Sequence, residues 1–116
     1  MVGTLLNVST YSPQAPASTD QYVAVFAALS EPIRARMLQM LAQLEGEDLP
    51  CTALDEELPI AKSTISYHVQ ILRRAGLIGV RKAGRNYFYQ LRTETFETYA
   101  PGFLEHLAET DEPILT

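Results

Sequence analysis

The stretch that decides the fold is KSTISYHVQILRRAGLI, which runs from Lys62 to Ile78. Its apolar residues recur at helical spacing, so the pattern predicts a helix from Ala61 to Ala75 with one buried side. Gly76 follows as a natural C-terminal stop. On a helical wheel at about 100° per residue, the predicted buried stripe consists of Ala61, Ile65, Val69 and Leu72.

The opposite side of this helix carries hydroxyl, amide and basic groups and no carboxylate. Such a face suits a helix in the major groove of DNA, because hydroxyls and amides bond to base edges and cations neutralise phosphates. The alternative is an ordinary polar surface helix whose last two arginines complement the helix dipole. The face consists of Ser63, Tyr67, Gln70 and Arg74, flanked by Lys62, Ser66 and Arg73.

A basic β-hairpin is predicted directly after this helix. Its strands are Leu77 to Lys82 and Asn86 to Arg92, and Gly84 allows a tight connection between them. Cations crowd the tip of the hairpin, where they repel one another unless an anion compensates. The tip residues are Arg81, Lys82, Arg85 and Asn86. A hairpin placed in this way is typical of the wing of a winged helix-turn-helix.

The other helices are predicted from caps and periodicity. Tyr22 to Leu29 is a short helix with Asp20 as N-cap, and Ser30 caps the next helix, whose apolar stripe runs from Ile33 to Leu44. Cys51 to Leu58 is a short acidic helix ended by Pro59. The last stripe is Phe96, Tyr99, Phe103 and Leu107, interrupted by Pro101 and Gly102. It predicts either one kinked helix or a helix that starts near Pro101, and we favour the second.

The predicted fold is therefore mainly α with a small β-hairpin, a winged helix-turn-helix of order α-α-α-α-β-β-α. With 116 residues the chain has the length of one domain. We expect residues 1–20 to be a disordered N-terminal arm, because they are rich in Ser, Thr, Pro and Ala. Residues 21–110 then form the DNA-binding and dimerisation domain, and residues 111–116 form a C-terminal tail.

Charge is segregated along the chain. The net charge is −5, yet Ile60 to Arg92 contains seven cations and no Asp or Glu, so the rest of the chain carries −12. Solubility alone favours interspersed signs, so an anionic partner on the basic segment is indicated. Neither a membrane span nor a secretory signal is recognisable, and the single cysteine cannot form an intramolecular disulfide. A cytoplasmic protein is expected.

The quoted run, followed by VRKAGRNYFYQL (Val80 to Leu91), resembles the winged helix-turn-helix of the ArsR/SmtB repressors. SEPIRARMLQML (Ser30 to Leu41) is similar to the segment that opens their second helix. The resemblance implies a homodimeric transcriptional repressor that an inducer releases from double-stranded operator DNA. With the face described above, it predicts DNA contacts by Lys62, Ser63, Thr64, Ser66, Tyr67, Gln70, Arg74, Arg81, Lys82, Arg85 and Asn86.

The metal sites associated with that family are incomplete in this sequence. Its thiolate sites use two or more cysteines, and only Cys51 is present. Its zinc motif in the last helix, D-x-H-x10-H-x-x-E, is matched by His106 and Glu109, but Thr93 and Thr95 stand where the Asp and the first His belong. We therefore predict no metal site and no cofactor, and the sequence does not identify the inducer.

Two further side chains allow a functional and an ordinary interpretation. Cys51 could be a reactive thiol at a helix N-terminus, but a lone cysteine is more often a small buried hydrophobe, and we favour the latter. His68 flanks the core stripe, and we expect it to be packed or hydrogen-bonded rather than a metal ligand.

Dimerisation is predicted from the apolar ends of the chain, residues 1–29 and 96–107, and from the few base pairs that a monomer reads. No catalytic set is present, since a hydrolase needs a nucleophile beside a base and no phosphate-binding or dinucleotide-binding fingerprint occurs. The prediction is a sequence-specific DNA-binding transcription regulator that is not an enzyme. The alternative is a protein–protein adaptor whose basic face binds an acidic partner.

Overall fold

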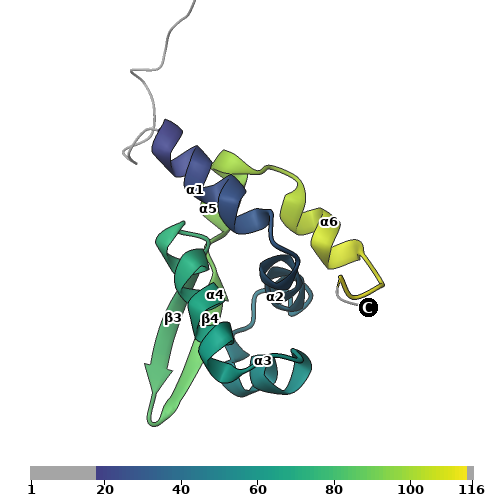
Figure 1. Cartoon of the computed structure of the whole chain (residues 1–116). Coiled ribbons are helices and arrows are strands. Elements are labelled where there is room, and N and C mark those ends of the chain that lie inside the picture. The colour runs from purple at the N-terminus through teal and green to yellow at the C-terminus, as the bar shows by residue number, and fades with distance from the viewer. Residues whose placement is uncertain (1–17, 115–116) are drawn as a thin grey trace, which may run out of the picture.

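The computed structural model describes residues 18 to 114. In these residues the basic hairpin projects from one end of a helical body, and α2 (Pro32–Ala42) lies at the centre (Figure 1). The elements follow the predicted order, with one additional short strand and one additional helix. They are α1 (Thr19–Leu29), α2, β2 (Leu49–Pro50), α3 (Cys51–Glu57), α4 (Lys62–Arg74), β3 (Ile78–Ala83), β4 (Asn86–Leu91), α5 (Thr93–Tyr99) and α6 (Phe103–Glu109).

The helix-turn-helix consists of α3 and α4, both within one residue of their predicted bounds. Gly76 ends α4 in a left-handed conformation, with φ of 80°. The amide of Leu77 donates to the carbonyl of Leu72 at 3.0 Å, and that of Gly76 donates to Arg73 at 2.9 Å. This is the Schellman arrangement, which satisfies carbonyls at the helix end. One detail of the prediction is wrong, because Ala61 is the exposed N-cap of α4 and not part of the buried stripe.

The wing belongs to a three-stranded antiparallel sheet of order β2-β4-β3. β3 and β4 pair from Ile78 with Leu91 to Ala83 with Asn86, so the turn is shorter by one residue than predicted. No element was predicted directly before Cys51, but Leu49 pairs there with Tyr89. A Pro is compatible with β2 because β2 lies at the edge of the sheet.

The first two helices begin at caps other than those predicted. Ser18, not Asp20, caps α1, and its hydroxyl accepts a hydrogen bond from the Gln21 amide at 3.1 Å. Glu31, not Ser30, caps α2, and its carboxylate accepts from the amides of Ile33 and Arg34. Carboxylates and hydroxyls both fill this role, so neighbouring candidates compete and composition alone does not select between them.

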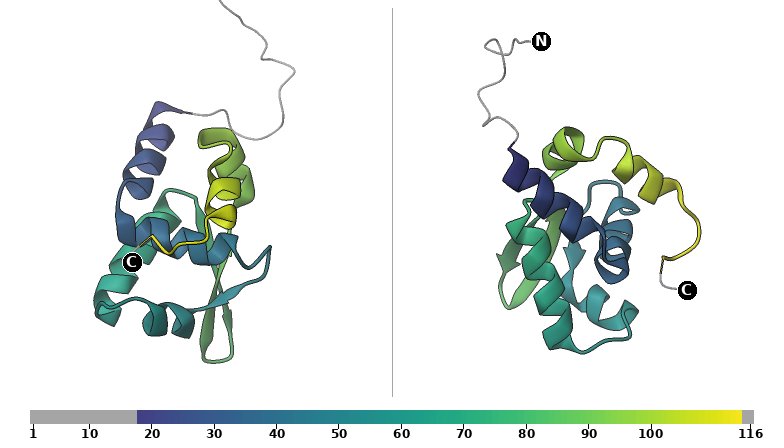
Figure 2. Two further views of the ribbon diagram at one scale, coloured as in Figure 1. Left: turned by 90° about the vertical axis from the view of Figure 1, so that its right-hand side faces the viewer. Right: turned by 45° about the horizontal axis from the view of Figure 1, so that its top comes forward.

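The helix that we favoured near Pro101 is present as α6, which begins at Phe103, and the first part of the stripe forms a separate helix, α5, that was not predicted. Gly102 joins them with φ of 88°, a conformation that a residue with a side chain adopts at a cost. Helix α6 lies beside α2 (Figure 2), and α5 meets α1 where the rings of Tyr99 and Tyr22 pack together.

Part of the predicted tail is held against α2. Gln39 is fully buried, and its side-chain amide donates to the carbonyl of Glu112 at 3.0 Å while its oxygen accepts from the Ile114 amide at 3.1 Å. Arg36 donates to the same oxygen at 3.0 Å and pairs with Glu57 of α3 at 2.6 Å. A polar network thus joins residues 112–114 to the first helix of the helix-turn-helix.

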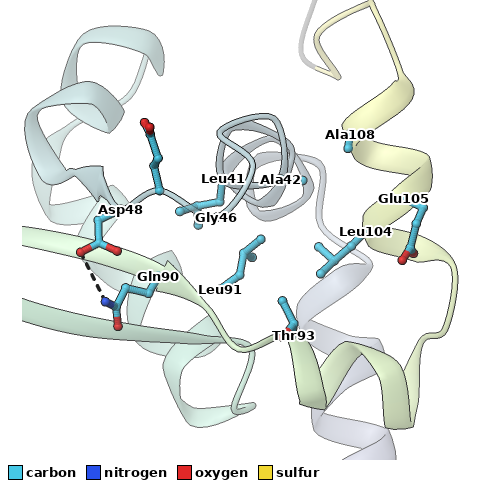
Figure 3. Close-up of a pocket in the computed structure, with 11 residues that line it drawn as sticks. Leu41, Ala42, Gly46, Asp48, Gln90, Leu91, Thr93, Leu104, Glu105 and Ala108 are labelled. Carbon is cyan, nitrogen blue, oxygen red and sulfur yellow. Dashed lines mark hydrogen bonds between the residues drawn. The ribbon is translucent and has the colours of Figure 1, made fainter.

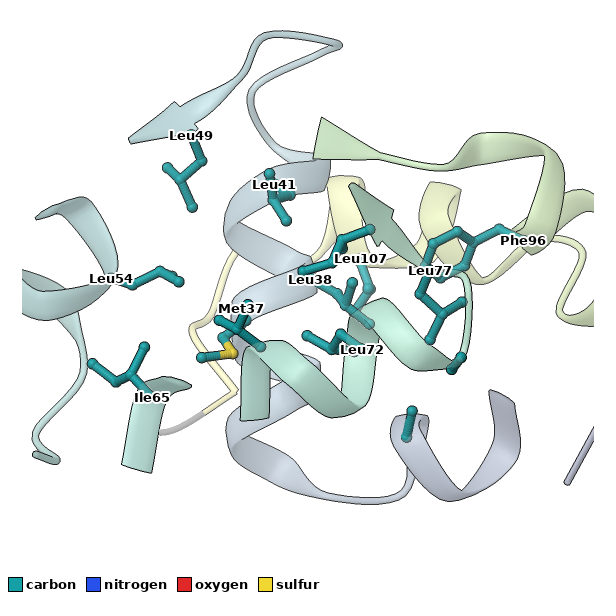
Figure 4. Close-up of a cluster of buried hydrophobic side chains, with 14 of the residues drawn as sticks. Met37, Leu38, Leu41, Leu49, Leu54, Ile65, Leu72, Leu77, Phe96 and Leu107 are labelled. Carbon is teal, nitrogen blue, oxygen red and sulfur yellow. The ribbon is translucent and has the colours of Figure 1, made fainter. Parts of the chain in front are cut away.

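The hydrophobic core lies around α2, between α4, the sheet and the two C-terminal helices (Figure 4). Leu72 of α4 and Leu38 of α2 are fully buried, and Phe96 and Leu107 bring α5 and α6 into the same core. Full burial of each such side chain contributes about 1.5–3 kcal/mol to folding. The position of α4 is therefore fixed by its apolar side, and its polar side is left free.

Candidate nucleic-acid interface

The outward side of α4 presents the residues that the wheel predicted. Ser63, Thr64, Ser66 and Arg74 are exposed, and Tyr67 has 62% of its surface exposed. Gln70 is half-buried. The buried side consists of Ile65, His68, Val69 and Leu72.

A cleft of about 250 Å³ separates α4 from the wing. Gln70 lies in its wall together with Tyr87 and Tyr89 of β4, so the amide sits between helix and sheet. Burial raises the pKa of the Tyr89 phenol, which keeps it neutral. Helix α4 and the wing therefore form one continuous surface with hydrogen-bonding groups along the cleft between them.

The predicted wing cations fall into two groups. Arg81 is engaged within the protein, because its Nε and Nη2 donate to the Asp48 carboxylate at 3.0 and 2.8 Å and its guanidinium lies over the Phe88 ring. Lys82 and Arg85 are exposed, and no salt bridge occupies either of them within residues 18–114, although the Lys82 ammonium lies 5.7 Å from the centroid of the Tyr87 ring. Asn86 is exposed beside them. Lys62, at the start of α4, is 84% exposed and only 3.9 Å from Asp55.

Asp48 was not recognised from the sequence as part of this region. Its carboxylate accepts from Arg81 and, at 3.3 Å, from Gln90 of β4. Those hydrogen bonds lower the pKa of Asp48, and the one from Arg81 contributes most. The Asp48 carboxyl group therefore stays ionised. Asp48 thus ties β3 and β4 to the segment before β2.

A buried hydrogen-bond cluster on the inner side of α4 was also not predicted from the sequence. Arg34 of α2 is 8% exposed, and its Nη1 lies 2.9 Å from Nδ1 of His68, itself 6% exposed. The same guanidinium donates to the carbonyls of Ala28 at 2.9 Å and Ala27 at 3.2 Å, at the C-terminus of α1. The expectation of a packed, hydrogen-bonded His68 is confirmed. The sequence did contain a signal for the burial of Arg34, because this residue recurs at helical spacing with Met37, Leu38 and Leu41, which are buried on the same side of α2.

The His68 ring must be neutral in this cluster. A guanidinium can only donate, so Nδ1 accepts and carries no proton. Burial, with a smaller contribution from Arg34, lowers the pKa of His68 below its ordinary 6.5, and Glu31 opposes this in part. A histidine with a lower pKa in the folded state binds protons more readily when the chain unfolds.

We therefore expect the free energy of unfolding to be fully retained above about pH 7 and to fall as the pH drops below about 6.5, the ordinary histidine value. Urea unfolding between pH 7.5 and 5 measures this. In a His68→Gln variant the decrease becomes shallower. In the matched His106→Gln variant, altered at an exposed histidine of α6, it does not change. Identical pH profiles for wild type and His68→Gln would contradict the assignment.

The other candidates from the sequence are not among the residues that line the cleft between α4 and the wing. Cys51 is partly exposed at the start of α3, while His106 and Glu109 are exposed on α6. Within residues 18–114, no group of three or more His, Cys, Asp and Glu side chains is placed to hold a metal ion. In the same residues, no helix is long and apolar enough to cross a membrane.

An apolar surface is exposed on α1. Phe26 has 54% and Val23 has 61% of its surface exposed, and Tyr22 lies beside them at 37%. The Tyr22 ring packs edge-on against Tyr99 of α5, with 4.6 Å between centroids. The predicted contribution of residues 1–17 to dimerisation lies outside the described residues.

Comparison with known proteins agrees with this geometry. A helix-turn-helix domain family matches residues 29–81. The chain is 44% identical over 91 residues to an uncharacterized HTH-type transcriptional regulator, YceK, of Bacillus subtilis, covering 78% of this chain and 90% of that protein. It is 30% identical over 91 residues to a transcriptional repressor SmtB homolog of Synechocystis, covering 78% and 67%.

Solved structures show the same fold. HlyU from Vibrio cholerae superimposes with a TM-score of 0.62 at 29% identity, covering 77% of this chain and 89% of that one. An ArsR family transcriptional regulator superimposes with a TM-score of 0.65 at 22% identity, covering 79% and 92%.

Proposed function

Because this chain belongs to the ArsR/SmtB family of winged helix-turn-helix transcription regulators, we propose that it is a homodimeric repressor that reads operator DNA with α4. The α4 side chains enter the major groove, and the wing contacts the neighbouring backbone. A repressor of this kind acts in the cytoplasm, where its operator is.

The observation that carries the proposal is the composition of the outward side of α4. Ser63, Tyr67 and Gln70 offer hydrogen-bond donors and acceptors without a fixed charge. Such groups can distinguish one base edge from another. The buried side of the same helix is packed into the core, so these groups are presented on a rigid element. In the proposed interface the base contacts come from Ser63, Thr64, Ser66, Tyr67 and Gln70, and the phosphate contacts come from Lys62, Arg74, Lys82, Arg85 and Asn86.

Arg81 was predicted to contact DNA, but we propose a structural role for it instead. Its guanidinium is shared between Asp48 and the Phe88 ring, so we assign it to holding the wing against the body. The wing tip is then represented by Lys82 and Arg85, whose charges are available to phosphates.

A two-fold dimer supplies the second half-site. The exposed surface of Tyr22, Val23 and Phe26 on α1 is the proposed contact, since it adjoins α5 through Tyr99. Two copies related by a two-fold axis would set their reading helices about 34 Å apart, one turn of DNA. The matched proteins, which are named as transcription regulators, favour this function over the adaptor.

The proposal is tested by separating base reading from phosphate contact. With Gln70→Ala we expect a loss of about 1–3 kcal/mol on the operator and little change on random duplex, because an amide that pairs with a base edge contributes only to sequence recognition. Arg85→Ala is the contrasting variant, expected to weaken both duplexes alike. It should also lower the slope of log K against log salt by about 1 per subunit, or about 2 per dimer.

The measurement is a titration of labelled duplex from upstream of the protein's own operon, with random duplex as competitor at several salt concentrations. Equal competition by random duplex at moderate salt would refute sequence-specific binding. An Arg85→Ala variant with the wild-type salt slope would show that the wing does not contact DNA. Binding to neither duplex would favour the adaptor.

A further inference from the structure

A cavity of about 480 Å³ lies on the side of the molecule formed by the end of α2, the segment before β2, the end of β4 and α6. Leu41, Leu91 and Leu104 come from three different elements and gather at its centre (Figure 3). Its size is that of pockets that hold small organic ligands. None of the proposed DNA contacts lines it, so it is a separate site.

The charged side chains in the cavity wall determine which charge a bound ligand can carry. Among residues 18–114, the charged side chains that line the cavity are all carboxylates, those of Glu47, Asp48 and Glu105. Arg81 neutralises Asp48. Glu47 and Glu105 are exposed and take part in no salt bridge with the described residues, so no cation among residues 18–114 neutralises them. A concave site of one sign concentrates ions of the other sign and repels like ones.

The apolar part of the wall selects the body of the occupant. Leu91 and Leu104 offer aliphatic surface, widened by the small side chains of Ala42 and Ala108. An inorganic cation gains nothing from such a surface, because hard cations require oxygen ligands on several sides. An ammonium group on an apolar body gains from both parts of the wall.

We propose that this cavity binds a small organic cation, with an aliphatic or aromatic body against the leucines and its positive group at the acidic rim, to which the exposed Glu47 and Glu105 belong. The site is independent of the DNA-binding function proposed above, since neither its residues nor its test involves DNA. Asp48 and Gln90 of its wall also contact each other.

The test uses the full-length protein without DNA. It compares three probes that share a phenyl ring on a short alkyl chain and differ in the charge of the end group. These are 4-phenylbutylammonium, 4-phenylbutanol and 4-phenylbutyrate, which are cationic, neutral and anionic. Titration is followed by the methyl NMR resonances of Leu41, Leu91 and Leu104. We expect saturable shifts with the cation, binding weaker by about tenfold for the alcohol because it forms no ion pair, and no saturable binding of the anion.

Variants at exposed positions then separate the contribution of the carboxylate charges to binding from the contribution of the cavity's shape. The double variant Glu47→Gln/Glu105→Gln should weaken binding of the cation by about tenfold and leave the alcohol unchanged. Glu109→Gln is the matched control, because it removes a carboxylate from the same helix outside the cavity and should have no effect. Ala108→Phe, which fills the cavity from an exposed position, should abolish binding of both probes.

Three results would overturn the proposal. Equal affinity for the ammonium and the alcohol would show that the carboxylates do not select the ligand. Equal weakening in the double variant and in Glu109→Gln would show only a general charge effect. Shifts confined to methyl groups outside the cavity would place the binding elsewhere.

Discussion

Replacement of Arg34 by Met is expected to lower the free energy of unfolding by about 3 kcal/mol. The change keeps an unbranched side chain of similar length and removes three hydrogen bonds, to the carbonyls of Ala27 and Ala28 and to His68. Hydrogen bonds to charged groups contribute about 1.5–3 kcal/mol each and are not additive, and acceptors left buried without a donor add to the cost.

Urea unfolding at pH 7.5 measures this difference from the shift in midpoint at constant slope. Arg85→Met is the matched control, because it makes the same chemical change at an exposed turn residue and should alter stability by no more than about 0.5 kcal/mol. Coincident unfolding curves for Arg34→Met and Arg85→Met would contradict the structural role given to Arg34.

The double variant Val23→Asp/Phe26→Asp is expected to separate the proposed dimer into monomers and to weaken operator binding by about 100-fold or more. Four like charges would be brought together at the two-fold contact, and each half-site would then be bound without the gain in effective concentration from its neighbour. Light scattering should show the mass falling from about twice 12.9 kDa to 12.9 kDa.

Both residues are largely exposed in the single chain, so circular dichroism should show unchanged helix content. Phe26→Leu, which keeps the surface apolar, is the control and should remain dimeric. A wild-type mass near 12.9 kDa at micromolar concentration would contradict the dimer. Unchanged operator affinity in a monomeric variant would show that the second half-site is dispensable.

Helix α4 and the wing could be predicted because their signals are local. The core side of α4 repeats at helical spacing, and Gly76 and Gly84 stand where the chain requires positive φ. These signals are complete within about thirty residues of sequence. Predicted and observed bounds of α3 and α4 agree within one residue.

The features that were missed depend on partners far away in the sequence. β2 is two residues long and is defined only by its pairing with β4, some forty residues later. Arg34 and His68 meet across 34 positions, and Asp48 and Arg81 across 33. No periodicity within one element encodes such a pair. Arginines in an otherwise apolar segment are ordinarily assigned to the surface, because buried charges are rare.

Arg34 has a mechanical consequence for the proposed dimer. Its guanidinium joins the end of α1 to His68 of α4, so in the proposed dimer a rotation of α1 about the two-fold axis would carry α4 with it. With reading helices about 34 Å apart, a rotation of about 5° shifts each by about 1.5 Å, since each lies about 17 Å from the axis. That displacement is enough to break the geometry of hydrogen bonds to base edges. An event that changes how two α1 helices cross would therefore switch operator binding without touching any residue that contacts DNA.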